Sequence, residues 1–150
     1  MLNRKNFARV GNTPGKTIHV NYFRIDEKLY FIDLPGYGFA NISKSERERW
    51  SRLMESFFSD CENITLGILI VDARHKPTAD DINMNEYFKT NHIPYCVVAN
   101  KIDKLKKSEY NDSINEIVSV LNLSLNDLVP FSAEKGTGKD LLVAKIVDIC

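Results

Sequence analysis

Residues 94–103 read PYCVVANKID, an apolar run that ends in a group of polar side chains. The run at 94–100 is expected to form a strand that is buried on both faces of a sheet. Open α/β sheets bind ligands just beyond the carboxyl ends of their strands. Asn100, Lys101 and Asp103 are therefore expected at a sheet edge where a ligand would bind.

Asp103 is suited to reading a guanine base. Guanine presents its N1–H and its 2-amino group side by side, and one carboxylate can accept from both. Adenine offers no such pair of donors and would leave the acid unpaired. Asn100 could bond the base edge or tie neighbouring loops together, and the aliphatic stem of Lys101 could cover the ring face. A polar turn after a strand is the alternative, but the spacing and the position favour a guanine site.

Strands and helices are expected to alternate around this stretch. Two β-rich runs joined at Asp26 and Glu27 predict a hairpin near the start of the chain. The later alternation predicts an α/β fold, in which helices cover both faces of a mostly parallel sheet. The expected strands are 19–25, 28–34, 64–72, 94–100 and 128–131, and helices are expected from Ser43, over 78–90 and 108–121, and after Gly138.

A second motif, Asp33, Leu34, Pro35 and Gly36, ends the second strand of the hairpin. Asp33 could hold Mg²⁺ through water, because Mg²⁺ keeps several waters in such sites. Gly36 would let the backbone N–H approach a terminal phosphate. A plain Pro-Gly turn is the alternative. The interpretation as a phosphate and Mg²⁺ site is favoured because the motif lies upstream of Asn100, with a strand and a helix between them.

A loop of turn-forming residues precedes the hairpin. Thr17 at its end could present a hydroxyl to Mg²⁺ and a backbone N–H to the terminal phosphate. Such a loop orders with the triphosphate and relaxes after hydrolysis, although a plain surface loop is the alternative. The residues of this loop are Thr13, Pro14, Gly15, Lys16 and Thr17.

The turn after the last expected strand contains Ser132, Ala133 and Glu134. Its backbone N–H groups could donate to the guanine carbonyl oxygen as a second check on the base, and a serine turn before a helix is the alternative. The run GTGK at 136–139 is too short for a Walker phosphate loop. It also precedes the final helix rather than the first, so we reject it as a phosphate site.

Taken in order, these motifs resemble those of the translation-factor-related GTPases. More closely, the sequence resembles the EngB (YsxC/YihA) family of bacterial GTP-binding proteins over essentially its whole length. The residues that narrow the resemblance are 13–17, 33–38, Lys44, Glu46, Arg47, Trp50 and 71–78.

The resemblance implies a Ras-like G domain, which has the P-loop NTPase fold, over residues 1–150. It implies binding of GTP and GDP with Mg²⁺, slow GTP hydrolysis, and roles in large ribosomal subunit assembly and in cell division and septation. The implied partner is the large ribosomal subunit or its RNA. The resemblance implies that Thr17 and Asp33 hold the metal, and it implies no catalytic residue. The implied nucleotide-binding residues are Thr13, Pro14, Gly15, Lys16, Thr17, Asp33, Leu34, Pro35, Gly36, Asn100, Lys101, Asp103, Ser132 and Ala133.

One departure from the family concerns the start of the chain. Family members begin with a strand and a Gly-rich loop that ends in Gly-Lys-Ser, whereas residues 2–6 resemble the tail of the following helix. The domain is therefore expected to be incomplete at its N-terminus, without its first strand and phosphate loop. We expect such a chain to leave unpaired sheet edges, to be unstable and to hydrolyse GTP negligibly.

Composition is that of a globular protein, and 20 basic residues balance 20 acidic ones, so no global attraction to nucleic acid follows. The spacing of Cys61, Cys96 and Cys150 matches no metal site, which indicates reduced thiols. No apolar run is long enough to cross a membrane. We expect a cytoplasmic monomer that does not enter membranes.

Other functions remain open. A non-enzymatic ribosome- or RNA-binding shell of a G domain could use Arg47, Arg49 and Arg52 as an RNA-facing patch, although a solvated helix face is simpler. A P-loop ATPase is disfavoured by Asp103. His75 is expected to be an exposed or loop-orienting side chain rather than a general base.

Overall fold

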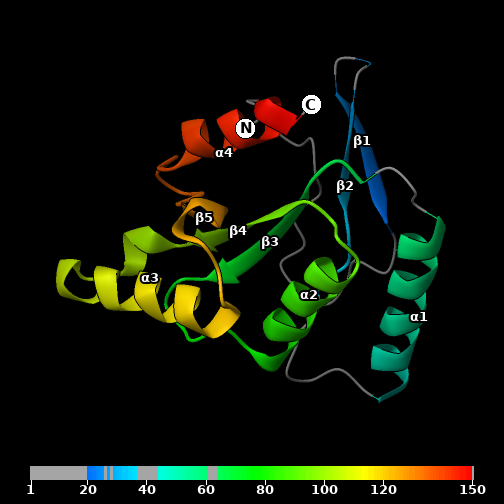
Figure 1. The fold of residues 1–150 in the computed structure, drawn as a ribbon, viewed down its shortest axis with the longest axis horizontal. Coiled ribbons are helices and arrows are strands. Elements are labelled where there is room, and N and C mark those ends of the chain that lie inside the picture. Colours follow the sequence, from blue (N-terminus) through cyan, green and yellow to red (C-terminus); the bar gives the residue numbers. More distant parts are fainter. Residues whose placement is uncertain (1–19, 26, 28, 37–43, 61–63, 150) are drawn as a thin grey trace. The chain divides into compact units, whose positions relative to one another are not determined.

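Two compact units make up the chain in the computed structural model (Figure 1). The smaller lies within residues 2–62 and the larger within residues 63–150. Each has its own strands, which are antiparallel in the smaller unit and parallel in the larger. The single domain expected over 1–150 stays a prediction. The residues that the structure describes are 20–25, 27, 29–36, 44–60 and 64–149.

An antiparallel hairpin forms the sheet of the smaller unit. Strand β1 (Asn21–Ile25) pairs with β2 (Leu29–Asp33), with Ile25 opposite Leu29 and Asn21 opposite Asp33. Alternate residues of β1 are exposed, as expected where one face of a sheet packs and the other meets water. The predicted hairpin is confirmed, and it brings Asp33 to the end of its strand.

Helix α1 (Lys44–Asp60) follows the hairpin in the same unit. Met54 of this helix is buried. Trp50 donates from its indole Nε1 to the carbonyl oxygen of Pro35 at 2.8 Å. This hydrogen bond ties the helix to the turn after β2, and therefore fixes the start of the segment that contains Gly36.

The sheet of the larger unit is parallel, with β4 between β3 and β5. Its strands are β3 (Gly67–Asp72), β4 (Tyr95–Asn100) and β5 (Leu128–Pro130). Asp72 lies beside Asn100 across one pair of strands, and Ala99 lies beside Pro130 across the other. The carboxyl ends of the three strands therefore meet at one edge of the sheet.

Helices separate these strands, as the sequence predicts, and they lie on both sides of the sheet (Figure 1). They are α2 (Ala79–Thr90), α3 (Lys107–Leu121) and α4 (Lys139–Ile149). Helix α2 begins with a capping box, in which the Thr78 hydroxyl accepts from the Asp81 N–H and the Asp81 carboxylate accepts from the Thr78 N–H. The predicted α/β fold is confirmed. In the described segments no helix has the length and apolar character that a membrane span needs.

Strand β4 forms the centre of the core in the larger unit. Val97 and Ala99 are 0% exposed, and Val98 is 2% exposed. Ile117 of α3 is 1% exposed. Burying a side chain of this size completely contributes about 1.5–3 kcal/mol. Packing on both faces therefore fixes β4, and with it the loop that follows Asn100.

The expected strand at 64–72 is a nearly continuous apolar run, which is typical of a strand that is buried on both faces. Strand β3 corrects that expectation. Leu69 and Val71 are 2% and 3% exposed, whereas Ile70 between them is 61% exposed. Successive side chains of a strand point to opposite faces, so the described helices of the larger unit cover the face of β3 that carries Leu69 and Val71. On that face Phe88 of α2 approaches Gly67 so closely that an added Cβ would lie 3.0 Å from its ring. The continuous apolar run could not reveal which face remains open.

Candidate functional site

The loops after β4 and β5 lie side by side at the carboxyl edge of the parallel sheet. Ile102 donates its N–H to the carbonyl of Phe131 at 3.2 Å, and Phe131 donates to the carbonyl of Ala99 at 2.9 Å. A short 3₁₀ turn, η1 (Ile102–Lys104), follows β4 at once. Lys101 precedes it with a left-handed backbone, φ 69°. This tight turn was not predicted, and it brings Asp103 back toward the loop after β5.

Asn100 connects the two loops through its side chain. Its Oδ1 accepts from the N–H of Lys101 at 2.8 Å and from the N–H of Ala133 at 3.2 Å. Of the two roles considered for this residue, the geometry favours tying the loops together. The N–H of Ala133, expected to reach a base carbonyl, is engaged by Asn100 in this structure, and the N–H of Ser132 donates to the carbonyl of Thr137 at 3.0 Å.

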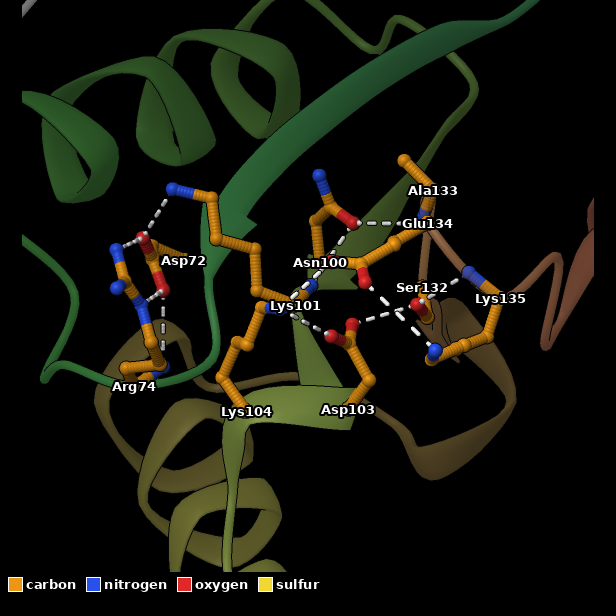
Figure 2. A network of polar contacts seen from close by, with 10 residues as sticks. All are labelled: Asp72, Arg74, Asn100, Lys101, Asp103, Lys104, Ser132, Ala133, Glu134 and Lys135. Atoms are coloured by element: carbon orange, nitrogen blue, oxygen red, sulfur yellow. Dashed lines mark hydrogen bonds and ion pairs between the residues drawn. The ribbon is translucent and has the colours of Figure 1, made fainter.

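Asp103 and Ser132, from the two loops, form a partly buried hydrogen-bonded pair (Figure 2). The Ser132 hydroxyl, on a residue that is 0% exposed, donates to Asp103 Oδ1 at 2.5 Å. The same oxygen of Ser132 accepts from the N–H of Lys135 at 3.0 Å, which fixes its direction. This donation from Ser132 lowers the pKa of Asp103, with Lys104 as a further cause, so the carboxyl is ionised at neutral pH.

The second carboxylate oxygen of Asp103 differs from the first in its partners. Oδ2 is buried and accepts no hydrogen bond from the described residues. Lys104 Nζ lies 3.3 Å away as an ion pair, which supplies charge but no aligned hydrogen bond. A buried, unpaired acceptor costs free energy until a donor reaches it. Asp103 is therefore prepared to accept from a ligand that presents N–H groups.

Lys104 also forms an ion pair beside this site. Its Nζ lies 2.6 Å from Glu134 Oε2, and this ion pair joins the turn after β4 to the loop after β5. The loops enclose a pocket of about 200 Å³, smaller than the few hundred Å³ of typical whole-ligand pockets and of a size for one part of a ligand. The residues that line it are Asn100, Lys101, Asp103, Lys104, Ala133 and Glu134.

A cluster of three charged residues borders the pocket at the end of β3 (Figure 2). Arg74 donates to both carboxylate oxygens of Asp72, from Nε at 2.9 Å and from Nη2 at 2.6 Å. Lys101 donates from Nζ to Asp72 Oδ2 at 2.8 Å. These contacts, with Arg74 first, hold the pKa of Asp72 well below its usual range.

Sequence reasoning assigned no role in a site to the side chains of Asp72, Arg74, Lys104 and Glu134. A signal was present for the first two, because an acid and a base two residues apart end a strand of the parallel sheet. For Lys104 and Glu134 no pattern within one segment was available, because their contact joins residues 30 positions apart. His75 is exposed, as expected.

The second motif lies in the smaller unit, and its position relative to Asn100 is not assigned. Asp33 is exposed at the end of β2, and Asn21 Nδ2 donates to its Oδ2 at 3.4 Å. Pro35 is buried and held by Trp50, with Leu34 half-buried before it and Gly36 exposed after it. The predicted features outside the described residues are Thr13, Pro14, Gly15, Lys16, Thr17, the helix start at Ser43, the start of the chain, Cys61 and Cys150.

Known proteins match this chain in sequence. A sequence model described as a 50S ribosome-binding GTPase matches residues 1–101. A protein of Oceanobacillus iheyensis named as a probable GTP-binding protein EngB is 45% identical over 141 residues, which are 93% of this chain and 72% of that protein. An Anoxybacillus flavithermus protein of the same name is 46% identical over 141 residues, 93% of this chain and 73% of that protein.

Solved structures match the fold. The crystal structure of a probable GTP-binding protein engB superimposes with a TM-score of 0.79 at 24% identity, over 93% of this chain and 86% of that chain. The structure of Era with MgGDPNP and a segment of 16S ribosomal RNA gives a TM-score of 0.65, over 93% of this chain and 47% of that chain. The order of motifs, the extent of the sequence match and the shared fold agree, and the chain belongs to the EngB family of GTPases.

Proposed function

We propose that this chain is a nucleotide switch that binds GTP and GDP through its parallel-sheet unit. The observation that carries the proposal is the carboxylate of Asp103, which has one oxygen oriented by Ser132 and a buried second oxygen that no described residue donates to. The N1–H and 2-amino group of guanine would supply the missing donors. The names of the relatives, GTP-binding proteins, agree with this assignment.

Each residue of the pocket has a distinct part in the proposed site. Asp103 reads the guanine edge and Ser132 holds it in position. Asn100 keeps the two loops together through its contacts with Lys101 and Ala133. The stem of Lys101 covers one ring face. The N–H of Ala133 reaches the base carbonyl only if it is shared with or released from Asn100.

The phosphates and Mg²⁺ are assigned to the smaller unit. Asp33 is an exposed carboxylate at a strand end, and its hard oxygen atoms suit Mg²⁺. Thr17 would supply a second oxygen ligand, and the residues Thr13, Pro14, Gly15 and Lys16 before it would form the loop that responds to the terminal phosphate. Gly36, which follows the anchored Leu34–Pro35 turn, would offer its backbone N–H. Bound Mg²⁺ would neutralise charge on the phosphate oxygens.

The cellular role is proposed to be assembly of the large ribosomal subunit, in contact with that subunit or its RNA, together with cell division and septation. The description of the matching family as a 50S ribosome-binding GTPase supports a ribosomal role. That match spans residues of both compact units, which supports their forming one G domain. We place this role in the cytoplasm and in a monomer, with the free, buried thiol of Cys96 as the supporting observation for a reducing compartment.

Calorimetric titration with GTP, GDP and ADP, each with and without Mg²⁺, tests the proposed function. GDP is expected to bind and ADP to show no measurable heat, because adenine cannot supply the donor pair that Asp103 lacks. Mg²⁺ is expected to strengthen the binding of GTP. Equal binding of GDP and ADP, or no binding of either, would contradict the assignment.

A second candidate function is an RNA-binding shell that has lost nucleotide binding. Arg47, Arg49 and Arg52 are all exposed on α1, so their guanidinium groups are accessible to phosphates. Filter binding to ribosomal RNA at two salt concentrations would measure this function. RNA binding that falls steeply with salt, in a chain that gives no heat with GDP, would favour the shell over the switch.

A further inference from the structure

The side chain of Lys101 does not extend freely from its loop but reaches back to the neighbouring strand (Figure 2). Its backbone belongs to the loop after β4, and its Nζ lies 2.8 Å from Asp72 at the end of β3. Lys101 also lines the pocket beside Asn100 and Asp103. The methylene groups between these two ends are therefore held along the edge of the pocket.

Asp72 accepts three hydrogen bonds from Arg74. Arg74 donates to Oδ1 from Nε at 2.9 Å and from its backbone N–H at 3.1 Å, and to Oδ2 from Nη2 at 2.6 Å. A guanidinium that contacts both oxygens fixes the plane of the carboxylate as well as its charge. The side chain of Asp72 is 28% exposed, so solvent screens these contacts less than it screens a fully exposed pair.

The segment that carries Asp72 is anchored on two sides. The N–H of Ala73 donates to the carbonyl of Asn100 at 2.8 Å, which extends the pairing of β3 with β4. The hydroxyl of Ser113 on α3 donates to the carbonyl of Ala73 at 2.5 Å. Asp72 and Arg74 therefore stand on a fixed part of the backbone, and Lys101 is held against a rigid partner.

We propose that Asp72, which is fixed by hydrogen bonds from Arg74, is a positioning residue that holds the Lys101 side chain extended. The methylene groups of Lys101 then form one wall of the base pocket before the ligand binds. This inference rests on the proposed function, because it assigns a part of the same site. A lysine loses rotamer freedom when a ligand packs against it, and a stem fixed beforehand removes that cost from binding. The wall faces the ring rather than its edge, so it strengthens binding without changing the choice of base.

A double-mutant cycle on GDP affinity tests the coupling. Asp72→Asn removes the charge that holds Lys101, and Lys101→Met keeps an aliphatic stem without its ammonium group. Asp72→Asn is expected to weaken GDP binding about three- to tenfold, the effect of one newly mobile side chain. In the Lys101→Met background it is expected to have no further effect. Asp112→Asn, at an exposed aspartate of α3, is the matched control and should leave GDP affinity unchanged.

The ratio of GDP to IDP affinity distinguishes a positioning role from general damage to the loop. IDP lacks the 2-amino group that Asp103 is proposed to bind. Asp72→Asn is expected to weaken both nucleotides by the same factor, because Asp103 is undisturbed. A fall in the GDP/IDP ratio would show that the guanine-reading loop itself has moved, and would overturn the specific assignment of Asp72 to Lys101.

A measurement without nucleotide keeps the inference separate from the proposed function. Acylation of Lys101 by an amine-reactive ester, followed by mass spectrometry, is expected to be several-fold faster in Asp72→Asn, with exposed Lys107 unchanged as the internal control. An unchanged rate of Lys101 acylation would show that Asp72 does not hold the lysine side chain, whatever the measured nucleotide affinities are. If the unsubstituted chain binds no GDP, the proposed function fails and the pocket wall fails with it. If it binds GDP selectively and Asp72→Asn binds equally tightly, the inference alone is wrong.

Discussion

Replacing Gly138 by alanine tests how the loop after β5 is held in position. Gly138 has a φ of +79°, and a Cβ added to it would lie 2.1 Å from the carbonyl oxygen of Pro130. The left-handed backbone costs a residue other than glycine about 1–2 kcal/mol. Relieving the contact with Pro130 requires a backbone shift, and overpacking of this kind costs about 1–3 kcal/mol. The two effects together predict a loss of about 3 kcal/mol in the free energy of unfolding.

Gly136 offers a matched control within the same loop. Its φ is +73°, but a Cβ added there would meet no atom within 4 Å. Gly136→Ala should therefore lose only the backbone term of about 1–2 kcal/mol. At about 2–4 °C per kcal/mol for a chain of this size, thermal melts followed by circular dichroism should show losses of about 6–12 °C for Gly138→Ala and about 2–8 °C for Gly136→Ala.

The same pair of variants connects stability to the site. The loop closes through the Gly136 N–H, which donates to the carbonyl of Ser132 at 2.8 Å, and through the Ser132 N–H, which donates to the carbonyl of Thr137 at 3.0 Å. Displacement of Gly138 should therefore also weaken GDP binding, and more than Gly136→Ala does. Equal melting-temperature losses in the two variants would refute the reasoning, because the approach to Pro130 would then cost nothing.

Two further predictions concern buried polar groups. Asn85 is 0% exposed, donates to the carbonyl of Leu121 at 2.9 Å and accepts from the hydroxyl of Tyr95 at 2.8 Å. Asn85→Ala should therefore lower the free energy of unfolding, measured in urea, by about 2 kcal/mol. A loss near zero would contradict this prediction. The pKa of Asp103 is lowered, chiefly by Ser132, so its ionised form persists below the usual carboxyl range and is lost only as the pH falls through the lowered value. GDP affinity should therefore stay constant from about pH 8 to about pH 5. The Ser132→Ala variant should begin to lose GDP affinity at a higher pH than the unsubstituted chain. A fall in the GDP affinity of the unsubstituted chain near pH 6 would count against the assignment.

Much of the architecture could be predicted because its signals are local. The apolar run before Asn100 and the helical pattern after Thr78 both lie within single segments, and both elements form where they were expected. The position of Asp103 beyond a strand was predictable for the same reason. Its orientation was not, because the hydroxyl that sets it belongs to Ser132, 29 positions later in the chain.

Features that depend on tertiary contacts were missed or wrong. Ile70 belongs to a continuous apolar run, but its exposure depends on which helix covers which face of β3. The left-handed backbone of Lys101 gives no sequence signal, because lysine rarely adopts it. The contact between Lys101 and Asp72 joins residues 29 positions apart and exists only because β3 and β4 pair in parallel.

The most direct test of the central claim is the nucleotide preference of Asp103→Asn. Xanthine carries a carbonyl where guanine carries its 2-amino group. The amide of Asn at position 103 can donate to that carbonyl, and it can no longer accept from both the N1–H and the 2-amino group of guanine. Calorimetry with GDP and XDP should show that the substitution weakens GDP by about tenfold or more and strengthens XDP. A variant that melts cooperatively, binds GDP as tightly as the unsubstituted chain and gains nothing for XDP would show that Asp103 does not read the base.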